Sequence, residues 1–131
     1  MKLKHLKELN KTLENLNLTK QEVCIVGSGV LAVLGLRENK DLDIIILHAK
    51  RECIAPNDKN FSISKNVECV SANWLKNYSA ELSDDRIIND PNLHFVKFDF
   101  KFCNLELLKK KKQSSMRAKD KEDLRLINDR S

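Results

Sequence analysis

Two short segments of this chain carry residue types that could bind and activate a phosphate. Asp41 and Asp43 are separated by a single residue, and they open an apolar run that ends at Leu47. Because side chains two positions apart in a strand point to the same face, the two carboxylates are expected side by side. Carboxylate oxygens are ligands for Mg²⁺, and a pair of such ions stabilises the attacking and leaving oxygens when a nucleotidyl group is transferred. The spacing therefore predicts a magnesium site at Asp41 and Asp43.

The segment Gly27-Ser28-Gly29 lies between one apolar run at 23–26 and another at 30–36. This pattern predicts a buried strand, a tight turn and a short helix. The backbone N–H groups of such a turn, together with a serine hydroxyl, can hold a phosphate group. We expect Gly27 and Ser28 to bind a triphosphate.

Apolar periodicity predicts the elements that position these residues. A single helical stripe within residues 1–18 is formed by Leu3, Leu6, Leu9, Leu13 and Leu16, and we expect it to face the core rather than a partner. Strands are expected at 23–26, 40–47 and 66–70, with a loop at 48–65 that holds at most a short element near Phe61. The alternation over 94–102 favours either one strand or a hairpin bent near Asp99. Helices are expected to begin near Trp74 and to cover 119–127.

Length and composition limit the class of protein. With 131 residues, 41% of them hydrophobic and 33% charged, the chain suits one domain over 1–131, in which helix 1–18 precedes a core at 23–127. We expect an α+β fold, a small mixed β-sheet packed by helices. Seven aromatic residues are too few for a platform that stacks single-stranded nucleic acid. No apolar run is long enough for a membrane span or a signal peptide, so we expect a cytoplasmic protein with no membrane partner.

Charge and cysteine usage add little specificity. The net charge of +5 suits a polyphosphate or nucleic-acid partner as well as plain solubility. The four cysteines show no C-x-x-C pair, so we expect reduced thiols. The basic run at 109–112 is expected to be a solvated helical face, although a lysine near its end could reach a phosphate.

The combination of motifs resembles a known family. Gly27-Ser28, twelve intervening residues and Asp41-Leu42-Asp43 are similar to the signature of the polymerase-beta-type nucleotidyltransferase superfamily, above all its minimal single-domain bacterial members. Gly35-Leu36-Arg37 is similar to the glycine and arginine that often precede the aspartates there. The ending Arg117-Ala118-Lys119-Asp120-Lys121-Glu122-Asp123-Leu124 resembles the closing helix of those proteins. The resemblance spans 23–127, with the middle weakly constrained.

This resemblance implies a palm-type fold of the polymerase-beta kind and Mg²⁺-dependent transfer of a nucleoside monophosphate from a triphosphate, with ATP favoured, to an acceptor hydroxyl. It implies that Gly27 and Ser28 bind the nucleotide and that Asp41 and Asp43 bind the metal ions. It also implies a third carboxylate, which would ligate metal and help activate the acceptor. Glu68 is our candidate for that role, and Asp99 is its rival.

Other functions stay open at this point. The same fold without turnover could serve as a binding module, such as the antitoxin-like partner of a second protein, or as a homo-oligomer. A small nucleic-acid binder driven by the +5 charge is a weaker alternative. The acceptor is equally open, because an antibiotic, a sugar phosphate, a tRNA end and a protein hydroxyl present the same group.

Overall fold

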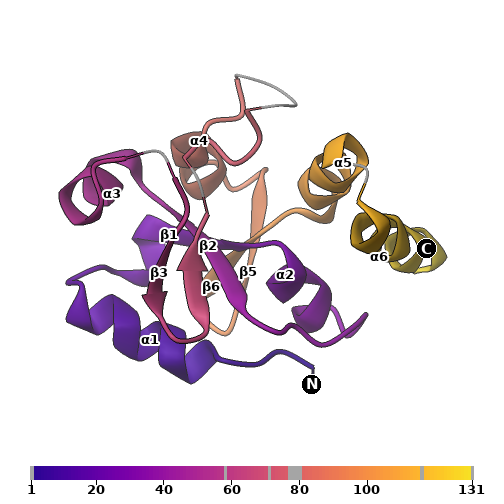
Figure 1. The fold of residues 1–131 in the computed structure, drawn as a ribbon, viewed down its shortest axis with the longest axis horizontal. Coiled ribbons are helices and arrows are strands. Elements are labelled where there is room, and N and C mark those ends of the chain that lie inside the picture. The colour runs from indigo at the N-terminus through magenta and orange to yellow at the C-terminus, as the bar shows by residue number, and fades with distance from the viewer. Residues whose placement is uncertain (1, 58, 71, 77–80, 116, 131) are drawn as a thin grey trace.

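A mixed sheet with helices around it forms the framework of the molecule (Figure 1). The computed structural model describes residues 2–57, 59–70, 72–76, 81–115 and 117–130. Within them the helices are α1 (Leu6–Asn15), α2 (Ser28–Val33), α3 (His48–Ile54), α4 (Asp84–Asn89), α5 (Leu105–Ser115) and α6 (Ala118–Asp129), with a 3₁₀ turn η1 at Lys20–Glu22. The strands are β1 (Val23–Val26), β2 (Leu42–Ile46), β3 (Phe61–Ser64), β4 (Val67–Cys69), β5 (His94–Lys97) and β6 (Phe100–Cys103).

The described strands form one six-stranded sheet in the order β3-β4-β2-β1-β6-β5. The central pair β1 and β2 is antiparallel, whereas β2 with β4 and β1 with β6 are parallel. The edge pairs β3 with β4 and β5 with β6 are antiparallel. The expected α+β class with a mixed sheet is therefore confirmed. In Figure 1, α5 and α6 lie together at one side of the sheet.

The core is built where the sequence is most continuously apolar. All four residues of β1 are fully buried, because strands in the middle of a sheet are covered on both faces. From the N-terminal helix, Leu9 and Leu13 are buried, while Leu3, Leu6 and Leu16 pack against the same core. The leucine stripe is thus a core face, as expected. None of the described helices is long and apolar enough to cross a bilayer.

The expected loop at 48–65 is wrong in part, because this segment contains α3, whereas β3 lies at the short element expected near Phe61. Its structure depends on Arg51, whose side chain is 2% exposed. The Arg51 guanidinium donates to the carbonyl oxygen of Val70 at 2.7 Å and lies 5.0 Å from the centre of the Phe61 ring. A buried arginine that ties α3 to two strands is a tertiary interaction, and local periodicity carries no sign of it.

The structure also tests the expected elements at 94–102 and near Trp74. Residues 94–103 form a hairpin, with Phe98 and Asp99 both at positive φ in the turn. The helix expected near Trp74 is a short turn where it is described, and its continuation at 77–80 lies outside the described residues. The neighbouring helix is α4, capped by the Ser83 hydroxyl, which accepts from the backbone N–H of Arg86.

Gly29 allows α2 to pack directly on the sheet. A Cβ atom added there would lie 2.6 Å from Ile25 Cγ2 and 3.0 Å from Leu42 Cδ2. Both distances are shorter than normal van der Waals contact. The glycine that follows Ser28 is therefore required for packing.

We expect Gly29→Ala to lower the free energy of unfolding by about 1–3 kcal/mol through overpacking, as measured by urea denaturation. Gly35→Asn is the matched control. Nothing lies within 4 Å of the Cβ position at Gly35, and asparagine tolerates its φ of +78°. A Gly29→Ala protein as stable as the parent would contradict this account.

Candidate functional site

Three adjacent strands bring the expected site residues to one place. Asp43, the second residue of β2, pairs with Val26 of β1 on one side and with Glu68 of β4 on the other. Because register partners in neighbouring strands point to the same face, the Asp43 and Glu68 carboxylates lie side by side. Gly27 follows Val26 directly. The turn and the two acids therefore meet at one end of β1, β2 and β4.

Gly27 lies close to the Asp43 carboxylate. Its φ of +66° and ψ of −141° belong to a region that glycine alone enters easily. A Cβ atom at this position would lie 3.0 Å from Asp43 Oδ2. Both the backbone conformation and the close approach require glycine. Ser28, which begins α2, lines the same pocket as Asp43.

The carboxylate of Asp43 is perturbed by its surroundings. Burial, and then the negative charges of Glu68 and Asp41, raise the pKa of Asp43 to about 6, although Lys119 and Lys112 oppose the shift. Asp43 is only partly compensated by these lysines. A divalent cation beside Asp43 and Glu68 would reduce the repulsion, since carboxylate oxygens are ligands for hard cations.

The three carboxylates are not equally well positioned for a common ligand. Asp41 precedes β2 and is exposed, with its carbonyl oxygen accepting from Asn39 Nδ2 at 3.1 Å. Glu68 accepts a short hydrogen bond from the Asn60 side chain. Within the described ranges, no three His, Cys, Asp or Glu side chains converge closely enough to enclose a metal ion.

Asp99, the rival to Glu68, lies elsewhere. It is in the β5–β6 turn, immediately before β6, and β6 runs parallel to β1. Asp99 is therefore at the end of the sheet where β1 starts, next to Lys20 and Gln21, whereas Gly27 follows the opposite end. Because β1 and β6 are parallel, Asp99 lies at the end of the sheet away from Gly27 and is not part of the site.

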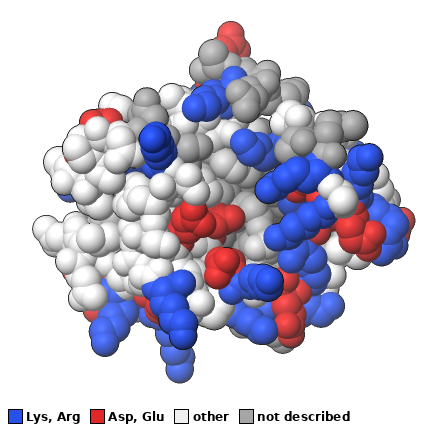
Figure 2. Space-filling view, in the orientation of Figure 1, with Lys and Arg blue, Asp and Glu red and all other residues white. Residues whose placement is uncertain are grey.

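Two adjoining pockets open beside Asp43. The first is lined by the Gly27-Ser28 turn and by basic residues of α5 and the start of α6, including Lys111, Arg117 and Lys119. The second shares Asp43, Lys111 and Arg117 with the first and extends to Glu68. Figure 2 shows acidic atoms near the centre of this face, with basic atoms gathered beside them over α5 and α6. The site thus joins an acidic centre to a basic wall.

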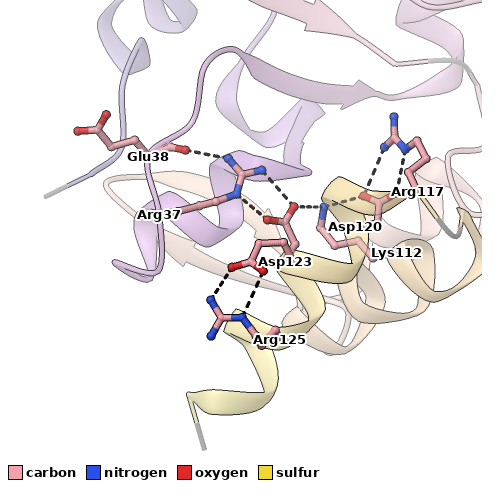
Figure 3. Close-up of polar contacts among 8 residues, drawn as sticks. Arg37, Glu38, Lys112, Arg117, Asp120, Asp123 and Arg125 are labelled. Carbon is pink, nitrogen blue, oxygen red and sulfur yellow. Dashed lines mark hydrogen bonds and ion pairs between the residues drawn. The ribbon is translucent and has the colours of Figure 1, made fainter.

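Buried ion pairs hold that basic wall in place (Figure 3). Asp123 of α6 accepts from Arg37 Nε at 2.7 Å and from Lys112 Nζ at 2.7 Å. Asp120 accepts from Lys112 Nζ at 3.2 Å and from Arg117 Nε at 2.8 Å. The chain of contacts runs from the segment before β2 to the start of α6, so it links the loop that leads to Asp41 with the helices that carry the cations.

Sequence reasoning missed the role of Lys112, which was expected on a solvated face. Its side chain is 8% exposed and lies between Asp120 and Asp123. Burial raises the pKa of Asp123, but hydrogen bonds from Arg37 and Lys112 outweigh this and leave the pKa below its ordinary value. The available signal was the pair of acids three residues apart in the last helix, which face one side of that helix and need partners if buried.

Comparisons of this chain with protein-family models, with curated proteins and with solved structures find no match.

We expect Asp43→Asn to stabilise the protein at pH 7.5 by about 2 kcal/mol. The folded-state pKa near 6 exceeds the ordinary value of 3.8, so the native protein binds the proton more tightly and loses stability as the pH rises through this window. The gain should shrink towards zero near pH 4, as thermal melts at both pH values would show. Asp41→Asn, at an exposed position, is the control and should change stability less. An equal gain at both pH values would contradict the electrostatic cause.

We expect Asp123→Asn to destabilise the fold by about 1.5–3 kcal/mol, because the buried Lys112 and the partly exposed Arg37 would each lose a charged hydrogen-bond acceptor. The depressed pKa means that the native pairing stabilises the protein above the unfolded pKa and is lost as the pH falls through the folded pKa. Glu122→Gln breaks an ion pair with Arg125 in which both side chains are 58% exposed and should cost less than about 1 kcal/mol. Denaturant unfolding of both variants at pH 7 measures the contrast, and equal losses would rule out a special role for Asp123.

Proposed function

We propose that this chain is a Mg²⁺-dependent nucleotidyltransferase with the palm-type fold of the polymerase-beta superfamily. It would transfer a nucleoside monophosphate from a nucleoside triphosphate, with ATP as the favoured donor, to an acceptor hydroxyl. The observation that carries the proposal is the cross-strand pair of Asp43 and Glu68, placed against Gly27 and facing a pocket with a basic wall. The proposal needs both the paired carboxylates and the basic pocket, because neither feature alone suggests nucleotidyl transfer.

The first pocket is the proposed triphosphate site. Ser28 and the adjacent amides offer hydrogen-bond donors, and Lys111, Arg117 and Lys119 offer positive charge. Within the part of the chain that the structure describes, Lys119 forms no ion pair, so its charge is available to an anion. Lys111 donates to the carbonyl oxygen of Trp74 at 2.8 Å, which holds its ammonium group at the pocket wall. These cations would orient the donor and attract the pyrophosphate that leaves.

The acidic centre is the proposed metal and acceptor site. Asp41, Asp43 and Glu68 would hold Mg²⁺ through carboxylate oxygens, and their mutual repulsion, seen in the raised pKa of Asp43, fits such an ion. When bound, Mg²⁺ supplies charge neutralisation at the phosphate oxygens. Glu68, which lines the second pocket, would accept the proton of the acceptor hydroxyl as its oxygen bonds to the α-phosphorus and the bond to pyrophosphate breaks.

A second candidate is a binding module of the same fold without turnover, such as the antitoxin-like partner of another protein. The exposed position of Asp41, outside the strand pairing, favours it. The leucine stripe of α1, which could have bound a partner, instead packs on the core and gives it no support. Such a module would keep nucleotide binding and lack transfer.

Incubation with each labelled triphosphate, Mg²⁺ and candidate acceptors should show label transfer that Asp43→Asn lowers by about 100-fold or more, a loss typical of removing one group that stabilises transition-state charge. Asp99→Asn is the control, because this carboxylate lies at the other end of the sheet. It should leave transfer unchanged.

The same samples distinguish the two candidates. Mg²⁺ with a triphosphate should raise the melting temperature, since a ligand that binds only the folded state stabilises it. A raised melting temperature without transfer would favour the binding module. Equal transfer by the parent and Asp43→Asn proteins would refute the proposed enzyme.

A further inference from the structure

The N-terminal segment contacts both chain segments that lead into the acidic centre. Asn39, which is 1% exposed, bridges the two sides: its Oδ1 accepts from the backbone N–H of Lys4 at 2.8 Å, and its Nδ2 donates to the carbonyl oxygens of Lys4 and Asp41, each at 3.1 Å. His5 Nε2 lies 2.8 Å from the carbonyl oxygen of Lys40. The approach to β2 is thus attached to residues 4 and 5.

The other contact is made by Glu8, in the first turn of α1. Its carboxylate accepts from the backbone N–H of Asn66 at 2.8 Å, from Asn66 Nδ2 at 2.9 Å and from the Ser64 hydroxyl. Hydrogen bonds from Ser64 and then Asn66 lower the pKa of Glu8 to about 2, so the group is ionised at neutral pH. Ser64 ends β3, and residues 65 and 66 form the turn that leads into β4.

Asn66 connects this contact to the site. Its side chain and N–H are bound by Glu8, while its carbonyl oxygen accepts from the N–H of Leu42 at 2.8 Å. Leu42 precedes Asp43, and Asn66 lies two residues before Glu68. The hydrogen bond between Asn66 and Leu42 therefore sets how β2 and β4 begin to pair, and the Asp43–Glu68 pair is the next step of the same ladder.

We infer that residues 4–8 form a clamp that fixes the relative position of Asp43 and Glu68, with Glu8 as its positioning residue. The clamp touches backbone and support residues rather than the carboxylates, so it acts through the strand starts. Its effect on metal binding and transfer rests on the proposed function, whereas its effect on the strand pairing does not.

The test compares the full chain with Glu8→Gln, which keeps the size of the side chain and removes its charge. Amide hydrogen exchange at Asn66 and Leu42, followed by NMR, should become about tenfold faster or more, while exchange at Ile25 in β1 stays unchanged. Glu14→Gln, at an exposed position of the same helix, should change none of these rates. Ser64→Ala removes one of the hydrogen bonds to Glu8 and should give a smaller change in the same direction.

A second variant tests whether Glu8 acts only by stabilising the fold. Leu16→Ala, at the residue that follows α1, lowers stability by reducing packing on the core and leaves the Glu8 carboxylate unchanged. Compared with Leu16→Ala under conditions that equalise their melting temperatures, Glu8→Gln should raise the Mg²⁺ concentration for half-maximal transfer several-fold. Unchanged exchange at Asn66 and Leu42, or the same local acceleration in Leu16→Ala, would overturn the clamp. Absence of nucleotidyl transfer in the parent protein would refute the proposed function. The hydrogen-exchange rates would still test the clamp.

Discussion

The site depends on keeping two carboxylates together although their charges repel. Asp43 and Glu68 occupy paired positions of β2 and β4, so the carboxylates cannot separate fully without disturbing the backbone hydrogen bonds of the sheet. Burial of Asp43 makes the repulsion stronger than it would be in water. A fold tolerates such an arrangement when the rest of the molecule fixes it, and strongly perturbed acids in a pocket are typical of functional sites. The sheet register and its supports are therefore the part of the structure that the proposed chemistry needs most.

Positive charge near the site is divided between structural and accessible groups. Arg37, Lys112 and Arg117 pair with Asp120 and Asp123, and these contacts anchor α6 beside the loop before β2 (Figure 3). The two acids are almost completely buried, so the partners contribute chiefly by preventing uncompensated charge in the interior. The wall of the pocket can then present Lys119 to an incoming anion without collapse of the helices onto the acidic centre. Lys112, whose side chain is 8% exposed, serves chiefly as an anchor, whereas Arg117, whose side chain is 72% exposed, pairs with Asp120 and also lines the pocket.

Local sequence patterns predicted those elements whose position depends on neighbouring residues in the chain. The bounds of β1 follow from an uninterrupted apolar run that ends in glycine, and the stripe of α1 follows from helical spacing. Helix α3 was missed, and β3 was expected only as a short element near Phe61, because the buried Arg51 holds both through long-range contacts. Lys112 was misplaced for the same reason, since its surroundings include an aspartate that is also bound by Arg37, 86 positions away along the chain. The candidate acids were identified by type and order, but the choice of Glu68 over Asp99 needed the directions of β4 and β6.

The three acids are also held with different firmness, and this bears on how a ligand would be bound. Asp43 and Glu68 lie within paired strands, whereas Asp41 lies outside them and is fixed mainly through its carbonyl oxygen, which Asn39 binds. The carboxylate of Asp41 can therefore rotate while its backbone stays in place. If the proposed Mg²⁺ is bound, Asp43 and Glu68 would hold it from paired strands, and Asp41 would contribute an exposed side chain, which costs conformational entropy when it becomes ordered. In the proposed site the sheet would therefore supply the rigid part, and the segment before β2 would supply the adaptable part.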